Sequence, residues 1–324
     1  MKKITHLGID IGGAHLKIIG VDENERVRFV DYSSCRIWED IDKLKIKFLQ
    51  LNKTFSGKPI KCAITMSAEL CDNFKNRKHG VSILIEKCNY LNFDKFFYVA
   101  SSEIFSKKPK LDELISMNWH SIGRFIQQKI QNAIIVDFGS TTTDLICIKE
   151  GKVLNKFLDD FSRINNYELL YTGFTRTPIF GVTNEIEIHK KKLKIIPEFF
   201  SDTSDIYRVL QKLKKQIDID KTADHSNKTI RNSLKRISRS FGFDYKMKFK
   251  GKLKAISNQI SLIQLNYVLD AINKLKLRFD LEDFTIITSG TGQDVITSFL
   301  KKKKYKTKFF YSFLKNSCLN KQAS

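Results

Sequence analysis

Two stretches of the chain share one pattern of apolar and polar positions. THLGIDIGGAHLKIIGVD and AIIVDFGSTTTDLICIKEG each contain an apolar run, an aspartate, a short polar turn and a second apolar run. This pattern predicts a β-hairpin with a carboxylate at the end of its first strand. When the two segments are aligned without gaps, Asp137 of the second corresponds to Asp10 of the first, and Asp144 corresponds to Lys17. The chain is therefore expected to contain this hairpin twice.

The segments around each hairpin predict an α/β organisation. VRFVDYSS predicts a third strand, and KPIKCAITMS and KFFYVASS predict further strands that are each followed by a polar helical stretch. The hairpin pattern returns at residue 132, and KTIRNSLKRISRSFG and LIQLNYVLDAINKLKL then have the apolar spacing of helices before FTIITSG returns to a strand. We expect one lobe at 1–131, a second at 132–298, a cleft between them and a basic tail at 299–324.

Composition narrows the class of protein. The chain has 324 residues, 42% of them hydrophobic, which is enough for a sizeable core. Its longest apolar runs are too short to cross a bilayer and its start does not fit a secretory signal, so we expect a cytoplasmic protein with no membrane partner. The formal net charge of +22 raises the possibility of nucleic acid. Because the lysines are spread over nearly every segment, we do not expect nucleic acid as a partner.

The residues of the two turns favour phosphate chemistry over a plain turn. Glycines allow close approach and leave backbone N–H groups open to an anion. A single Asp-Gly turn is usually only a turn, but its repetition favours a functional pair. Asp10 and Asp137 are then candidates for holding hydrated Mg²⁺, which prefers oxygen ligands. The candidate phosphate-binding residues are Gly12, Gly13, Gly139, Ser140, Thr141 and Thr142.

Three later segments add candidates. In TIITSGTGQDV a strand runs through Gly290 and Gly292 into a helix, whose N-terminal amides favour anions. In YTGFTRTPI, Arg176 can bind phosphate or carboxylate, the alternative being an ion pair between the lobes. In FFSDTSDIYRVL, Asp202 and Asp205 are expected to cap a helix, with a metal-binding or amine-binding role as the alternative.

Five segments in this order resemble a known family: GIDIGGAHLK, TMSAEL, DFGSTTTDL, YTGFTRTPI and FFSDTSDIYRVL. They are similar to the hydantoinase/oxoprolinase-related branch of the actin, Hsp70 and sugar kinase superfamily, associated with tetrahydromethanopterin-linked one-carbon metabolism and methanofuran biosynthesis. The resemblance covers about residues 4–293. It implies a two-lobed, duplicated actin-like ATPase fold of the ribonuclease H-like type, with the ligand between the lobes.

The resemblance also implies an activity, the displacement of diphosphate from a furanylmethyl diphosphate by a tyramine-derived amine or phenol acceptor. Asp10 and Asp137 would hold Mg²⁺, the turn glycines and hydroxyls would bind the diphosphate, and Lys17 and Arg176 would supply positive charge. One alternative is an ATP-dependent small-molecule kinase or a hydantoinase-like amide hydrolase, with ATP as a further cofactor. Another is a non-catalytic nucleotide-binding or nucleic-acid-binding protein.

Overall fold

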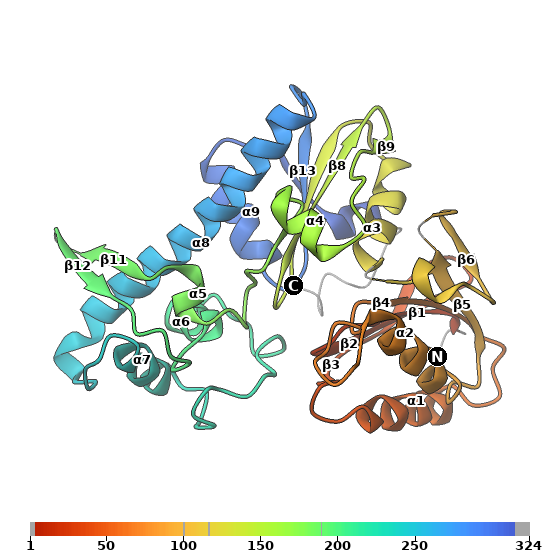
Figure 1. The fold of residues 1–324 in the computed structure, drawn as a ribbon, viewed down its shortest axis with the longest axis horizontal. Coiled ribbons are helices and arrows are strands. Elements are labelled where there is room, and N and C mark those ends of the chain that lie inside the picture. The colour runs from red at the N-terminus through yellow and green to blue at the C-terminus, as the bar shows by residue number, and fades with distance from the viewer. Residues whose placement is uncertain (1–3, 100, 116, 189, 315–324) are drawn as a thin grey trace. The chain divides into compact units, whose positions relative to one another are not determined.

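The computed structural model describes residues 4–99, 101–115, 117–188 and 190–314 (Figure 1). Within them the chain forms two compact units. The first runs to Ile130 and also includes Lys156–Ser162 and the residues from Tyr311 on. The second consists of Gln131–Asn155 and Arg163–Phe310. None of the helices in these ranges combines the length and apolar character that a membrane span requires.

The first unit is built on a six-stranded sheet with the order β3-β2-β1-β4-β5-β6. The pairs β1/β2 and β2/β3 are antiparallel, and the pairs β1/β4 and β4/β5 are parallel. The strands are β1 (Ile4–Ile11), β2 (His15–Asp22), β3 (Val27–Ser34), β4 (Lys61–Met66), β5 (Asp94–Val99) and β6 (Ile104–Ser106). The helices are α1 (Asp42–Thr54), α2 (Arg77–Cys88), η1 (Leu111–Glu113) and α3 (Asn118–Gln127).

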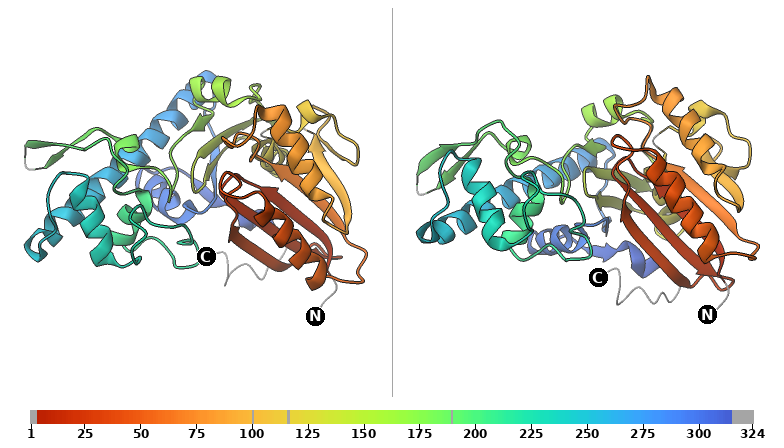
Figure 2. Two further views of the ribbon diagram at one scale, coloured as in Figure 1. Left: turned by 60° about the horizontal axis from the view of Figure 1, so that its bottom comes forward. Right: turned by 90° about the horizontal axis from the view of Figure 1, so that it is seen from below.

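The two faces of the first sheet differ because side chains alternate along a strand. Leu7 and Ile9 of β1 are buried with Phe48 of α1 and Leu84 of α2 in one hydrophobic core. Figure 2 shows α1 and α2 running along this face. Asp10, the neighbour of Ile9, is directed to the opposite face, where it lines a pocket.

The second unit has a sheet with the order β10-β8-β7-β13-β14, to which β9 is added beside β8. Its strands are β7 (Ala133–Phe138), β8 (Thr143–Lys149), β9 (Lys152–Val153), β10 (Leu169–Leu170), β13 (Thr285–Ser289) and β14 (Thr307–Phe309). A separate hairpin contains β11 (Glu185–Ile188) and β12 (Lys191–Lys194). Its helices are α5 (Ile179–Val182), α6 (Thr203–Val209), α7 (Ile230–Arg239), η2 (Met247–Phe249), α8 (Lys250–Arg278) and α9 (Gln293–Lys302). Helix α4 (Asp160–Asn165) begins in the first unit and ends in the second, and η3 (Phe310–Phe313) lies mostly in the first.

Five strands of the first sheet are repeated in the second in the same order. In the second, β10/β8 and β8/β7 are antiparallel and β7/β13 and β13/β14 are parallel, which is the sequence of directions found along β3, β2, β1, β4 and β5. The expected duplicated fold of the actin-like, ribonuclease H-like type is confirmed. The expected cleft between the lobes stays a prediction.

The structure corrects the expected basic tail at 299–324. Helix α9 continues to Lys302, and β14 at Thr307–Phe309 pairs with β13 as the fifth strand of the repeated order. The four lysines at 301–304 form the exposed end of α9 and the turn after it, so the sequence there resembles a solvated tail and does not predict the strand that follows. Residues 315–324 of the expected tail lie outside the described residues.

Helix α8 is 29 residues long and joins two parts of the second unit. Near its start, Ile256 and Ile260 pack with α5, α6 and α7 in one core. Further along, Val268 and Ile272 pack against the sheet in another core. Both views in Figure 2 place the β11–β12 hairpin and α7 at the end of α8 that is remote from the sheet.

Candidate functional site

The two predicted turns have the same backbone geometry. In the first, the Gly12 N–H donates to the carbonyl of His15 at 3.1 Å, and in the second the Gly139 N–H donates to the carbonyl of Thr142 at 2.9 Å. A Cβ added to Gly12 or Gly139 would lie 3.0 or 3.1 Å from that same carbonyl oxygen. The repeated sequence pattern therefore reflects a repeated structure.

The loop that carries Arg176 lies directly on the second turn. The Thr175 and Arg176 N–H groups donate to the Ser140 carbonyl at 3.1 and 3.0 Å. An Arg176 Nη1 donates to Thr141 Oγ1 at 2.9 Å. The close approach depends on Gly173, since a Cβ there would lie 2.4 Å from the Ser140 carbonyl oxygen. The structure thus brings the predicted arginine to the predicted hydroxyl turn.

The predicted glycine turn after β13 packs against the end of β7. Ser289 and Asp137 are partners in adjacent parallel strands, so both strands end at one edge of the sheet. Gly290 has a φ of +85°, and a Cβ there would lie 2.5 Å from Asp137 Oδ1. The Gly292 N–H donates to the Phe138 carbonyl at 2.9 Å. We call residues 139–142, 173–176 and 289–292, together with Asp137, the second-unit cradle.

Three hydroxyl groups of the second-unit cradle are buried without a hydrogen-bond partner among the described residues. They are Thr175 Oγ1, Ser289 Oγ and Thr291 Oγ1. Leaving a buried donor unsatisfied costs about 1–3 kcal/mol, so such groups in a native structure call for an explanation. An enclosed hydroxyl of this kind can be satisfied by a buried water or, after a local movement, by a ligand with acceptor oxygens such as a phosphate or diphosphate.

A buried glutamine of α8 holds the segment that leads into the cradle loop at residues 173–176. Gln264 of α8 donates through Nε2 to Thr172 Oγ1 and to the Gly173 carbonyl, both at 2.8 Å, and accepts from the Tyr207 hydroxyl at 2.7 Å. Burial raises the pKa of Tyr207, which keeps its hydroxyl a donor. Sequence reasoning missed Gln264, because a single polar position in a long helical pattern does not identify its distant partners.

The expected capping role holds for Asp202 and not for Asp205. Asp202 precedes α6 and accepts from the Ser204 and Asp205 N–H groups at 2.9 and 3.3 Å. Burial, with the charge of Asp205 nearby, raises the pKa of Asp202 to about 7. Asp205 instead accepts from Arg208 Nη1 and Arg236 Nη2, both at 2.6 Å, within a buried ion-pair network. Those arginines already neutralise Asp205, so the structure offers no support for a metal ion there.

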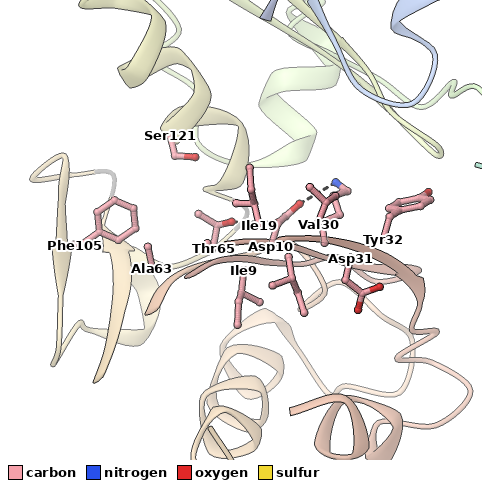
Figure 3. Close-up of a pocket in the computed structure, with 13 residues that line it drawn as sticks. Ile9, Asp10, Ile19, Val30, Asp31, Tyr32, Ala63, Thr65, Phe105 and Ser121 are labelled. Carbon is pink, nitrogen blue, oxygen red and sulfur yellow. Dashed lines mark hydrogen bonds and ion pairs between the residues drawn. The ribbon is translucent and has the colours of Figure 1, made fainter. Parts of the chain in front are cut away.

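The predicted Asp10 and Lys17 line a pocket of about 440 Å³ on the first sheet. Figure 3 shows the side chain of Asp10 on the face of the sheet opposite that of Ile9, which belongs to the core with α1 and α2. Asp10 and Lys17 are cross-strand partners in β1 and β2, and Lys17 Nζ lies 2.9 Å from Asp10 Oδ2. Thr65 of β4 donates to Asp10 Oδ1 at 3.2 Å. The pocket is lined by Gly8, Ile9, Asp10, Lys17, Ile18, Ile19, Val30, Asp31, Tyr32, Ala63, Thr65, Phe105 and Ser121. We call it the first-unit pocket.

Gly12 and Gly13 lie in the turn after β1 and not in the lining of this pocket. The Ile37 N–H donates to the Gly13 carbonyl at 2.9 Å, and a Cβ on Gly13 would lie 3.0 Å from Cys71 Sγ. The predicted residues are therefore divided between the first-unit pocket with its adjoining turn and the second-unit cradle, each described within its own unit.

The groups around Asp10 limit how well it suits Mg²⁺. No group of three or more His, Cys, Asp or Glu residues in the described ranges is arranged to hold a metal ion. Mg²⁺ needs fewer protein ligands than that, since it is commonly bound by one or two carboxylates together with waters and substrate phosphates. Both oxygens of Asp10 already accept hydrogen bonds, one of them from the cation of Lys17. Asp10 therefore has little remaining capacity to hold a hydrated Mg²⁺.

Comparison with known proteins places the chain in a family. The family model described as Hydantoinase/oxoprolinase matches residues 63–311. A protein of Methanocaldococcus jannaschii named (4-{4-[2-(gamma-L-glutamylamino)ethyl]phenoxymethyl}furan-2-yl)methanamine synthase is 31% identical over 302 residues, which cover 91% of this chain and 88% of the relative. A protein of the same name from Methanococcus vannielii is 32% identical over 173 residues, 53% of this chain and 77% of the relative.

Among solved structures, the chain is similar to a ROK family glucokinase from Streptomyces griseus in complex with glucose and AMPPNP. The two share 11% sequence identity, a TM-score of 0.47 and coverage of 96% of each chain. The match to the family model extends over more than half of the chain. The Methanocaldococcus jannaschii relative is more than 30% identical over most of both chains. This chain belongs to the hydantoinase/oxoprolinase family.

Proposed function

We propose that this protein is a synthase that joins the phenol oxygen of a tyramine-derived acceptor to the methylene carbon of a furanylmethyl diphosphate. The observation that carries the proposal is the 31% identity over 91% of the chain to a relative whose name describes a phenoxymethyl-furan product. The product would be a methanofuran-type coenzyme precursor, made in the cytoplasm and used in one-carbon metabolism linked to tetrahydromethanopterin.

The proposed reaction is a substitution without oxidation or reduction. The phenol oxygen forms a bond to the furanylmethyl carbon, and the bond from that carbon to diphosphate breaks with its electron pair leaving on the diphosphate. The phenolic proton must go to a base. Electron donation from the furan ring stabilises positive charge on the carbon as diphosphate departs, so the protein's main tasks are to stabilise the leaving group and to position the acceptor.

The second-unit cradle supplies groups suited to the leaving diphosphate. It offers the Arg176 guanidinium next to Thr141, and it contains the hydroxyls of Thr175, Ser289 and Thr291, for which the described residues supply no hydrogen-bond partner. Charge-assisted hydrogen bonds of this kind contribute about 1.5–3 kcal/mol each, and they strengthen as negative charge develops on the diphosphate. Mg²⁺ held at Asp137 would add a divalent charge beside the same oxygens. The proposed reaction does not require ATP.

The test uses purified protein with Mg²⁺, a furanylmethyl diphosphate and a γ-glutamyltyramine acceptor. We expect diphosphate release that depends on the acceptor and a coupled ether product identified by mass spectrometry. Arg176→Met should lower kcat/KM about 10-fold to 100-fold, the equivalent of one charge-assisted hydrogen bond. The matched control, Arg231→Met on the exposed side of α7, should leave it unchanged.

Two results would contradict the proposal. One is turnover of ATP to ADP in step with a phosphorylated product, which would assign a kinase activity. The other is diphosphate release at the same rate with and without acceptor, which would indicate a hydrolase.

A further inference from the structure

The first-unit pocket combines an apolar lining with a few polar groups, which is the chemistry of a site for an aromatic ring that carries one polar group. Gly8 and Ala63 leave space above the sheet, and Ile19 and Val30 give it an apolar floor. Figure 3 shows Phe105 on the same side of the sheet as Ile19 and Ala63. Apolar lining with a few placed polar groups is typical of small-molecule sites, in which the polar groups fix the ligand's orientation.

The polar groups of the pocket are concentrated at the Asp10–Lys17 pair. Thr65 orients the carboxylate of Asp10 through Oδ1, and Lys17 Nζ lies 2.9 Å from Oδ2. The side chains of Asp10 and Lys17 remain 21% and 50% exposed, so a ligand in the pocket can reach both. Tyr32 from β3 projects to the same side in Figure 3, whereas the carboxylate of Asp31 points to the other side.

A carboxylate beside an ammonium group matches the needs of a phenol that must lose its proton. The phenol O–H can donate to the carboxylate while its oxygen accepts from the ammonium group. As the proton moves, negative charge develops on the phenol oxygen, and a lysine at hydrogen-bond distance stabilises it. An aliphatic amine would gain nothing from Lys17, because two cations would repel each other at this position.

We propose that the first-unit pocket binds the phenol ring of the acceptor, with Asp10 as the base that receives the phenolic proton and Lys17 as the cation that stabilises the phenolate oxygen. This inference rests on the proposed function and makes Asp10 a catalytic residue in place of a metal ligand. The proton moves from the phenol oxygen to an Asp10 oxygen. The phenol oxygen then forms its bond to the furanylmethyl carbon, and diphosphate leaves with the electron pair of the bond that breaks.

The experiment compares acceptors whose phenols differ in acidity. Ring-fluorinated γ-glutamyltyramines have a lower phenol pKa at nearly the same size, so they depend less on a base and on a stabilising cation. Turnover is measured at saturating furanylmethyl diphosphate for the wild type, Asp10→Asn and Lys17→Met. Matched controls at exposed positions are Asp270→Asn and Lys53→Met. Urea unfolding of each variant shows whether its fold is intact.

With the unsubstituted phenol we expect Asp10→Asn and Lys17→Met to lower kcat about 100-fold, the lower range for a general acid–base contribution. The loss should shrink steadily as the phenol pKa falls, to less than about 5-fold with the most acidic acceptor. Both controls should match the wild type. A purely structural ion pair would not produce a loss that depends on the acceptor.

The possible failures are distinguishable. If the wild type forms no ether from any phenol, the proposed function fails and the pocket inference fails with it. If the wild type forms the ether but both variants lose the same factor with every acceptor, the proposed function stands and the pocket inference is overturned. In a second series the concentration of the furanylmethyl diphosphate is varied at saturating acceptor. An increase in the KM for this substrate alone would assign the pocket to it and also overturn the inference.

Discussion

Replacing Gly173 by alanine tests whether the Arg176 loop must lie directly on the second turn. The new Cβ would lie 2.4 Å from the Ser140 carbonyl oxygen and 2.5 Å from the carbonyl carbons of Ser140 and Thr141. Ordinary contact begins near 3.4 Å. The loop and the turn must therefore separate by about 1 Å, since backbone atoms cannot rotate away as a side chain does.

This separation has two measurable costs. The Ser140 carbonyl accepts from the Thr175 and Arg176 N–H groups, so moving the loop weakens those hydrogen bonds as well. Overpacking of this kind costs about 1–3 kcal/mol in the free energy of unfolding. A displacement of about 1 Å at a positioning contact can also lower turnover about 100-fold. Both effects are expected in Gly173→Ala, measured by urea unfolding and by the rate of acceptor-dependent diphosphate release.

Gly181→Ala is the matched control. Its new Cβ would lie 3.6 Å from Thr177 Cγ2, an ordinary contact, within the short helix α5. We expect its free energy of unfolding to stay within about 0.5 kcal/mol of the wild type and its turnover to be unchanged. If Gly173→Ala behaved like this control in both measurements, the close contact of loop and turn would contribute neither to stability nor to turnover, and the cradle would not need this geometry.

Three further predictions concern the support of the cradle. Gln264→Met should lower the free energy of unfolding by about 1–3 kcal/mol in urea, because it leaves the buried Tyr207 hydroxyl without its acceptor; an unchanged midpoint would contradict this. Arg236→Met should cost about 3–5 kcal/mol by the same measurement, since it removes a partner of the buried Asp205 carboxylate; a neutral result would mean that Arg208 suffices. Because its pKa is raised from 3.8 to about 7, Asp202 contributes stability that is full below pH 4 and lost as pH rises through 7. The wild type should therefore lose a few kcal/mol relative to Asp202→Asn between pH 4 and pH 8, and parallel pH profiles would contradict the shift.

The hairpins and their turns were accessible from the sequence because local signals define them. Asp10, Gly12, Asp137 and Gly139 recur at one spacing within alternating apolar runs, and the observed turns share one hydrogen-bond pattern. For Arg176 and Thr141, the sequence predicts only that both bind the same ligand, and it does not predict that they contact each other. Their direct hydrogen bond depends on how the loop at residues 173–176 packs against the turn at residues 139–142, about thirty residues earlier in the chain.

Other features depend on long-range contacts that no local pattern encodes. Gln264 looks like any polar helix position, yet it holds Gly173 and Tyr207 from a distant part of the chain. Strand β14 was concealed because three residues beside a lysine run carry too little alternation to be distinguished from a solvated tail. The aromatic lining of the first-unit pocket was missed as well, because Tyr32 and Phe105 come from different strands and converge only in the folded sheet.

The repeated strand order has a consequence for how the protein folds as it is synthesised. The hydrogen-bonded neighbours β1, β2, β3 and β4 all lie within the first 66 residues. In the second sheet, β7 pairs with β13 about 150 residues later, and β14 follows only at Thr307–Phe309. Pairing across such sequence separation is slow, because the loop must close before its contacts form. The edge of β7 that pairs with β13 therefore stays unpaired until Thr285–Ser289 has been synthesised, and an unpaired strand edge of this kind is exposed to aggregation in the nascent chain.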